Sequence, residues 1–294
     1  MKTLREVLAN ADAQRVAVGH FNISELAALK GIFAAAHGIT TPQHHDIPVI
    51  IGVSEGEREF IGVGQAVALV RSLREEYDYP IFLNADHTHL LENVRVAAEA
   101  GFDEILFDGS ALPFEENIAQ TKEAVRIVRS INSHIVIEGE IGYIGVSSEI
   151  VEKRPGNIAL STPEEAVRFV QLTGIDVLAP AVGNMHGLLK TMVAGTEEKH
   201  LDIELIKAIK AACGKYMTLH GGSGTANLDF VAAALAGMTI IHVSSELRLA
   251  WRHGVEKGLK NNPQEIAPYK ILPPAVEAIQ KIVADRLKLF NGLK

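Results

Sequence analysis

Short apolar runs rich in valine and isoleucine recur along the chain, and a longer stretch with helical periodicity follows each of them. Eight such runs are present, at residues 16–21, 48–53, 81–85, 104–108, 135–140, 177–182, 216–220 and 239–243. A strand that is buried on both faces is apolar throughout, and its alternation with helices predicts a parallel sheet. Eight strand–helix units in 294 residues match the size and strand count of a closed (β/α)8 barrel, the TIM barrel.

An open, doubly wound sheet is the alternative α/β architecture, and it would need a glycine-rich dinucleotide-binding turn after its first strand. The segment at that place reads GHFNISE and contains no such motif. Because no proline- or serine-rich linker divides the sequence, we expect residues 1–294 to form a single domain. Residues 273–294 have a charged amphipathic pattern, which predicts a C-terminal helical extension that covers the barrel or contacts a partner.

Charge and cysteine content argue against several functional classes. The 28 basic and 36 acidic residues give a net charge of −8 without a basic stripe, so we expect neither nucleic acid nor a membrane as partner. The one cysteine, Cys213, allows no disulfide within the chain, as is typical of the cytoplasm, and its helical pattern favours a packed residue over a nucleophile. Residues 1–14 do not resemble a signal peptide. The longest apolar stretch, 230–243, is interrupted and is shorter than the roughly 18 residues of a membrane span.

Polar side chains follow the predicted strands. In a (β/α)8 barrel the carboxyl ends of the strands meet at one mouth, where the active site forms. Histidines from three strand ends could meet there and hold zinc or another divalent metal, with a coordination position left open for substrate. The polar residues are Asn22, Ser54, Asp86, His87, His89, Asp108, Ser110, Glu138, Glu140, Asn184, His186, His220, His242, Ser244 and Ser245.

Taken singly, each histidine is better explained as a solvated or merely hydrogen-bonded residue, and only their joint placement favours a metal. Glu140 is a candidate for a fourth or an alternative metal ligand. The histidines that precede strands are interpreted as loop residues, and they are His44, His45 and His134.

Two segments suggest that a phosphate binds at the mouth. HGGSG follows the seventh predicted strand, and VSSE follows the eighth and opens a helix. Phosphate sites in these barrels are often built after strands seven and eight, where a helix N-terminus adds partial positive charge. A glycine-rich turn alone would be only a tight turn, so the position is what supports the prediction. Lys190 could add a cation.

The stretches HFNISE, VSEG, NADH, AGFDEILFDGS, EGEIG, AVGNMHG, LHGGSG and VSSELRLAW together resemble the class II, metal-dependent ketose-bisphosphate aldolases of the fructose- and tagatose-bisphosphate types. The resemblance runs along most of the chain. It implies a (β/α)8 barrel in a homodimer or homotetramer, and an aldolase that cleaves or forms a C–C bond in a ketose phosphate. A divalent metal would stabilise the enediolate of a dihydroxyacetone-phosphate-like half.

Carried over position by position, the resemblance implies His87, His186 and His220 as metal ligands, with Glu140 as an additional one. Asp86 would take the proton from the C4 hydroxyl of the substrate. Gly187 and Gly221 would also border a monovalent-cation site. The residues expected to bind substrate and its phosphate are Asn22, Ser54, Gly187, Lys190, Gly221, Ser223, Ser244 and Ser245.

Three departures from the family pattern bear on the substrate. The acidic loop that exchanges the enediolate proton is replaced by a segment with Ser147, Ser148 and Glu149, so Glu149 is the candidate catalytic acid. His242 stands where the family has an asparagine, and Met185 is larger than its family counterpart. We therefore expect weak activity on fructose 1,6-bisphosphate and better activity on another ketose phosphate.

Two other functions remain compatible with the sequence. The pair His87 and His89 would suit a metal-dependent hydrolase, although hydrolases with such a pair usually carry it on the first strand. The altered loop would suit a non-catalytic barrel that binds sugar phosphates.

Overall fold

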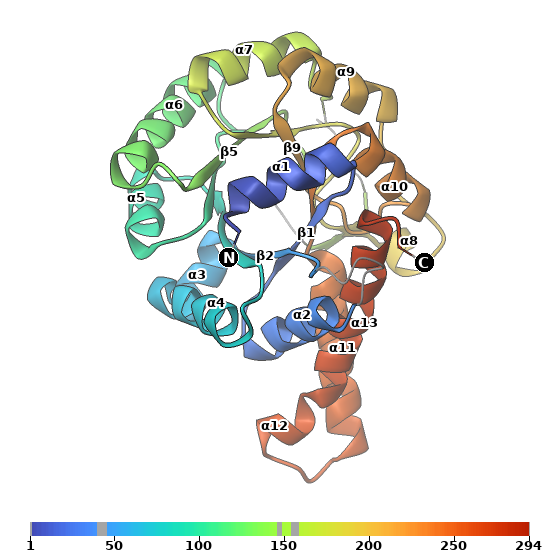
Figure 1. The fold of residues 1–294 in the computed structure, drawn as a ribbon. Helices are drawn as coiled ribbons and strands as arrows, with labels where there is room; N and C mark the ends of the chain where they lie inside the picture. Colours follow the sequence, from blue (N-terminus) through green and yellow to red (C-terminus); the bar gives the residue numbers. More distant parts are fainter. Residues whose placement is uncertain (1, 40–45, 146–148, 154–158, 294) are drawn as a thin grey trace.

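The computed structural model describes residues 2–39, 46–145, 149–153 and 159–293. Eight parallel strands close into a barrel in the order β1-β10-β9-β7-β5-β4-β3-β2, with helices around the outside (Figure 1). Each barrel strand overlaps one of the eight predicted runs, so the predicted (β/α)8 fold is confirmed. The barrel strands are β1 (Val18–Asn22), β2 (Val49–Val53), β3 (Ile81–Thr88), β4 (Glu104–Phe107), β5 (Val136–Ile141), β7 (Val177–Pro180), β9 (Tyr216–Leu219) and β10 (Met238–Val243).

Local signals in the sequence set the ends of several helices. The side chain of Thr162 accepts a hydrogen bond from the backbone N–H of Glu165, and Pro163 occupies the first turn of α7. Gly174 ends that helix with a φ of 77°, a conformation that glycine adopts without strain. The helices are α1 (Leu4–Gln14), α2 (Leu26–Gly38), α3 (Glu55–Ile61), α4 (Val63–Tyr77), α5 (Leu91–Ala100), α6 (Phe114–Ile131), α7 (Pro163–Thr173), α8 (Lys190–Val193), α9 (Ile203–Cys213), α10 (Asn227–Ala236), α11 (Ser245–Asn261), α12 (Pro268–Ile271) and α13 (Pro273–Phe290).

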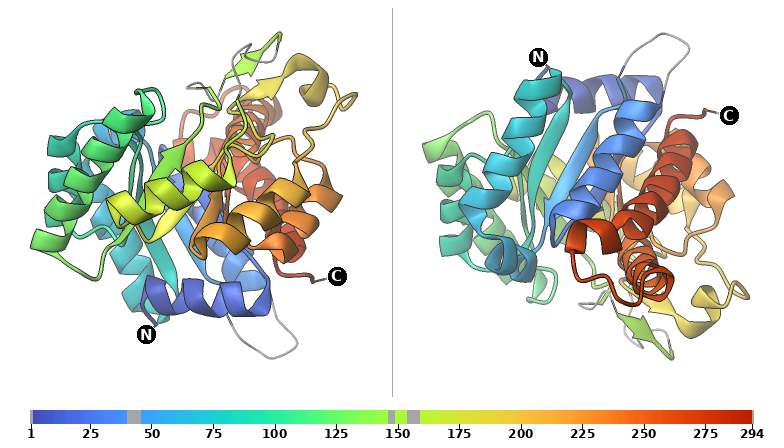
Figure 2. Two further views of the ribbon diagram at one scale, coloured as in Figure 1. Left: turned by 90° about the horizontal axis from the view of Figure 1, so that it is seen from above. Right: turned by 90° about the horizontal axis from the view of Figure 1, so that it is seen from below.

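The two ends of the barrel interior differ in chemistry. At the amino ends of the strands, apolar side chains such as Val18 and Phe82 pack against Leu4 and Leu8 of α1. This helix lies across that end of the barrel (Figures 1 and 2). Further along the strands the buried side chains are polar, among them His20, Asn84, Glu104, Glu138, Thr218 and His242. The fold therefore sets an apolar, closed end opposite a polar mouth.

A two-stranded sheet stands at the mouth, on the side away from α1 (Figure 2). It pairs β6 (Ile150–Val151) with β8 (Leu188–Leu189). The pairing joins the segment after β5 to the segment after β7, and it leaves Glu149 and Gly187 next to each other in the two segments. Ser147 and Ser148, like His44 and His45, lie outside the described residues.

The C-terminal region contains the predicted amphipathic helix. One face of α13 buries Ala275, Ile279, Val283 and Leu287, and the helix packs against α2 and α11. Gly254 of α11 allows the close approach, because a Cβ atom there would lie 2.3 Å from the Cα atom of Ala275. Figure 1 shows α12 at the tip of the arm that α11 and α13 form beside the barrel. In the described part of the chain, no helix combines the length and hydropathy that crossing a membrane requires.

Candidate active site

A cavity of about 540 Å³ opens at the carboxyl ends of the strands. Its lining includes the proposed base Asp86 and the three predicted histidine ligands. Of the residues given a catalytic, metal-binding or substrate-binding role from the sequence, those that line the cavity are Asn22, Ser54, Asp86, His87, Glu149, His186, Gly187, His220, Gly221, Ser223, Ser244 and Ser245. Tertiary folding thus brings together residues that are spread over more than 200 positions of the chain.

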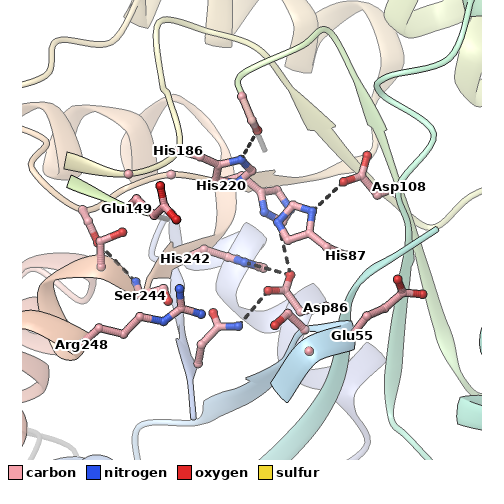
Figure 3. A pocket seen from close by; sticks show the side chains of 18 of the residues that line it. Glu55, Asp86, His87, Asp108, Glu149, His186, His220, His242, Ser244 and Arg248 are labelled. Atoms are coloured by element: carbon pink, nitrogen blue, oxygen red, sulfur yellow. Dashed lines mark hydrogen bonds and ion pairs between the residues drawn. The ribbon is translucent and has the colours of Figure 1, made fainter. Parts of the chain in front are cut away.

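His87, His186 and His220 each offer one ring nitrogen to a common point, and these three nitrogens lie within 4.8 Å of one another. Figure 3 shows the three rings at the centre of the cavity. The other ring nitrogen of each histidine is held by an oxygen. Nδ1 of His87 donates to Asp108 Oδ2 at 2.7 Å, and Nδ1 of His186 donates to the Gly145 carbonyl at 2.5 Å. Nε2 of His220 donates to Glu138 Oε1 at 2.7 Å.

This arrangement fits a divalent metal. Histidines that bind metals almost always donate their second ring N–H to a carboxylate or a carbonyl, which fixes the tautomer and the ring orientation. Here the three hydrogen bonds leave Nε2 of His87, Nε2 of His186 and Nδ1 of His220 available as ligands. Three imidazole nitrogens are a common ligand set for catalytic zinc and leave a further position open.

The charge states of the three histidines differ. Burial lowers the pKa of His186 and of His220 to about 3, so both rings are neutral, as metal ligands must be. Burial alone would lower the pKa of His87 as well, but the charge of Asp86 and the hydrogen bond to Asp108 raise it to about 10. A metal ion that binds His87 therefore displaces a proton from it.

Asp86 and His87 are neighbours in sequence and yet both face the mouth. The pairing of β3 with β4 shifts register between Ala85 and Thr88, and His87 has a φ of 41°, which is rare for a residue with a side chain. An irregularity of this kind re-aims side chains near active sites. It places Oδ1 of Asp86 3.8 Å from Nε2 of His87.

Hydrogen bonds from neighbouring elements hold Asp86 in place. The side-chain nitrogen of Asn22 donates to Asp86 Oδ2 at 2.8 Å and to Glu57 Oε2 at 2.9 Å. The buried Arg58 donates to the carbonyl of Asp86 at 3.0 Å. Burial would raise the pKa of Asp86, but the nearby His87 and His20 and the hydrogen bond from Asn22 keep that pKa below its ordinary value. The carboxylate is therefore ionised and oriented.

Comparisons with known proteins identify the family. A family model described as fructose-bisphosphate aldolase class-II matches residues 2–293. The chain belongs to this family. It is 32% identical over 293 residues to the probable fructose-bisphosphate aldolase of Bacillus subtilis, and the alignment covers 99% of this chain and 97% of that relative. It is 33% identical over 293 residues to the 6-phospho-5-dehydro-2-deoxy-D-gluconate aldolase of Halalkalibacterium halodurans, with 98% and 96% covered.

Among solved structures, the YdjI aldolase of Escherichia coli K12 superimposes with a TM-score of 0.80 at 27% identity, and 98% of this chain and 96% of that chain are covered. The predicted resemblance is confirmed, and the protein is a metal-dependent class II aldolase.

The side of the cavity where the sequence predicts a phosphate is built around the N-terminus of α11. The hydroxyl of Ser223 accepts hydrogen bonds from the backbone N–H groups of Ser244 and Glu246, both at 3.2 Å. Gly221 has a φ of 60°, and a Cβ atom there would lie 2.3 Å from the carbonyl oxygen of Met185. A glycine is therefore required where the chain turns under the predicted phosphate.

Two expected site residues of the aldolase do not reach the cavity lining. Oε2 of Glu140 lies 3.8 Å from Nδ1 of His87, the nitrogen that Asp108 binds, and so on the opposite side of the ring from the other two histidines. Lys190 is exposed, and its ammonium pairs with Glu152 at 2.6 Å. Met185, noted as larger than its family counterpart, does not narrow the cavity, because its side chain is fully buried and is not part of the cavity lining.

His242 and Glu149, which were singled out as departures, both line the cavity of the aldolase. The ring of His242 stacks on that of His20 with centroids 3.4 Å apart and planes within 3°. Its Nδ1 lies 3.7 Å from Asp86 Oδ1 (Figure 3). The lone pair of an imidazole nitrogen lies in the ring plane. A metal ion therefore cannot lie in the planes of both stacked rings. His20, Asp86 and His242 also have ligand atoms within 4.8 Å of one another, but because of this stacking they do not fit a shared ion.

Sequence reasoning left several residues of the site unnamed or without a role. It gave no role to Asp108, Glu138 or Gly145, whose oxygens orient the histidines. It also missed Arg248, which is the one lysine or arginine among the described residues that line the cavity. Its guanidinium pairs with the buried Glu57 at 2.7 Å. The motif VSSELRLAW contains this arginine. Its position in the first turn of the helix that follows the last predicted strand could have predicted that it lies at the mouth.

Proposed function

We propose that this aldolase cleaves or forms a C–C bond in a ketose phosphate with zinc as its metal, held by His87, His186 and His220. The observation that supports this most strongly is that each of the three histidines has one nitrogen fixed by an oxygen acceptor and the other directed to one point. A zinc ion there would act as a Lewis acid on the substrate carbonyl and offset the negative charge of the enediolate half. Glu140 would be a ligand only for an ion displaced toward Asp108.

In this proposal Asp86 is the base that takes the proton from the C4 hydroxyl. Its Oδ1 is buried and makes no hydrogen bond within the described part of the chain, so it is available to a substrate hydroxyl. Asn22 acts by orienting Asp86 rather than by donating its amide to the substrate. Glu149, at the edge of the cavity, would exchange the proton on the other half of the substrate.

The phosphate of the ketose half would bind at Gly187, Gly221, Ser223 and Ser245, with Ser54 and Ser244 in contact with the rest of the substrate. Ser244 and Ser245 at the N-terminus of α11 line this side of the cavity, and the partial positive charge of the helix end favours an anion there. Lys190 would have to leave Glu152 to contribute a cation.

The aldehyde half is where we propose a difference from fructose 1,6-bisphosphate. Relatives of about equal identity carry names for different substrates, so the family alone leaves this half open. His242 places an imidazole ring beside Asp86, where the family pattern has a smaller amide side chain. Arg248, which also lines the cavity, would meet a second anionic group of a substrate.

The decisive experiment is a screen of zinc-loaded protein against ketose mono- and bisphosphates, with the products identified by mass. We expect retro-aldol products from at least one ketose phosphate and weak turnover of fructose 1,6-bisphosphate. If fructose 1,6-bisphosphate is the best substrate, with kcat/KM of roughly 10⁴ M⁻¹s⁻¹ or more, the substrate proposal is wrong. Binding without turnover would support the non-catalytic alternative, and hydrolysis products would support the hydrolase.

A homodimer or homotetramer and a cytoplasmic location remain predictions from the family resemblance. Sedimentation of the purified protein and fractionation of cells would test them.

A further inference from the structure

The ammonium group of Lys199 is buried directly behind the cavity. Lys199 has no exposed surface, and its Nζ donates to the carbonyl oxygens of Met185 at 2.7 Å, Gly187 at 2.8 Å and Gly221 at 3.0 Å. A neutral amine has two N–H groups, whereas three carbonyl acceptors need three. The contacts therefore require the charged ammonium form.

The three carbonyls belong to the two turns that carry metal ligands and phosphate-binding positions. Met185 and Gly187 flank His186, and Gly221 follows His220. The backbone of Lys199 is itself anchored, because its N–H donates to the Gly224 carbonyl at 2.7 Å and its carbonyl accepts from the Ala226 N–H at 3.0 Å. One side chain thus ties the turn after β7 to the turn after β9.

The sequence resemblance implied a monovalent cation bordered by Gly187 and Gly221. A potassium or sodium ion binds backbone carbonyl oxygens of this kind, and an ammonium group competes with it for the same oxygens. Since Nζ of Lys199 is within hydrogen-bond distance of both carbonyls, the residues present do not fit an additional ion at that place.

We propose that the Lys199 ammonium takes the place of a monovalent cation. The ammonium positions the two turns and supplies positive charge behind the phosphate of the substrate. The part that concerns catalysis rests on the proposed function. The part that concerns ion binding does not, and the variants below test it by phosphate binding and melting temperature, without turnover.

The first test uses the wild-type protein. Turnover of the best ketose phosphate is measured at constant ionic strength in tetramethylammonium, sodium, potassium and ammonium chloride. We expect the same rate in all four salts, because tetramethylammonium is too large to replace an ion held by three carbonyls. Activation of the wild type by potassium or sodium relative to tetramethylammonium would overturn the proposal.

The second test is Lys199→Met, which keeps most of the apolar stem and removes the ammonium. We expect the affinity for inorganic phosphate, measured by calorimetry, to fall by about 10- to 100-fold, the range for a hydrogen bond to a charged group. Added potassium or ammonium should restore phosphate binding and raise the melting temperature of the variant, since an ion that binds the folded state stabilises it. Lys207→Met, at an exposed lysine of α9, is the control and should show neither response.

Lys199→Gln keeps two donors without the charge and provides a second variant if the methionine protein does not fold. It should fold, bind phosphate weakly and respond less to the added cations. If both variants bind phosphate normally, or if neither melting temperature depends on potassium or ammonium, the ammonium has only a packing role and the proposal is wrong. If phosphate binding responds as expected but no ketose phosphate is turned over, the proposed function fails while the cation replacement stands.

Discussion

Acidic side chains at the two ends of the barrel differ in how fully they are hydrogen-bonded. At the closed end Asp176 accepts hydrogen bonds from Arg5 at 2.8 and 2.7 Å, from Arg129 at 2.5 Å and from the backbone N–H of Ile137 at 2.9 Å. At the mouth, within the described residues, buried atoms of Asp86, Glu140, His242 and Ser244 make no hydrogen bond. Buried polar groups without partners reduce stability, so a protein retains them where a ligand will use them. The closed end thus stabilises the fold that the mouth requires.

The largest expected effect is at the mouth and follows removal of the metal. His186→Ala and His220→Ala should each lose the metal and all turnover, because the two remaining imidazole ligands are too few to hold the ion. The fold should persist, since the closed end and the helices do not depend on the ion. Metal analysis and circular dichroism measure the two properties, with His134→Ala as the control at the closed end. Full metal content in the first two variants would refute the ligand assignment.

Asp86→Ala tests the base and should reduce kcat by a factor on the order of 10² to 10⁴, the range of general acid–base catalysis. The metal should remain bound, because Asp86 belongs to none of the three hydrogen bonds that orient the histidines. Asp86→Asn is the matched variant, which keeps the shape and removes the proton acceptor. Near-normal turnover in the asparagine variant would place the base elsewhere.

Arg248→Gln tests whether the mouth selects substrates by charge. We expect KM to rise by about 10- to 100-fold for substrates with a second anionic group, since charge-assisted hydrogen bonds have this magnitude. Substrates without that group should be little affected, and Arg248→Lys should retain part of the selectivity. Steady-state kinetics with paired substrates measure the difference. An equal loss for both kinds of substrate would mean that the arginine only supports Glu57.

Asp176→Asn tests the closed end and should leave the kcat of the folded, metal-loaded protein unchanged. We expect the free energy of unfolding to fall by about 1–3 kcal/mol, because hydrogen bonds to charged arginines are weakened. Urea unfolding at neutral pH measures this change. A loss of turnover at unchanged stability would show that the two ends are not separate in function.

The same residue gives a pH dependence. Burial would raise the pKa of Asp176, but the hydrogen bonds from Arg5, Ile137 and Arg129 lower it below the ordinary value. A carboxyl group with a lowered folded-state pKa stabilises the fold above its unfolded pKa of about 3.9, and this contribution is lost as the pH falls through the folded pKa. Wild-type stability should therefore decline more steeply than that of Asp176→Asn below about pH 4. Parallel acid profiles would contradict the assignment.

The sequence by itself determined the fold class and the chemistry of the mouth. Alternation of apolar runs with helical periodicity is a local property, and the barrel rule then places polar residues such as His87, His186 and His220 at one end without any knowledge of their contacts. Periodicity does not say which nitrogen of a ring faces the centre, so the roles of Asp108, Glu138 and Gly145 came only from the structure.

Only the tertiary structure decided which of the remaining candidates take part. Met185 and Glu140 follow the right strands, but Met185 turns its side chain into the core, and Glu140 lies behind the ring of His87. No pattern in the sequence singles out Lys199, and yet its ammonium reaches carbonyls from the two turns that carry His186 and His220. Side-chain direction and contacts between distant segments are set by packing of the whole barrel, and a local pattern of residues carries no record of them.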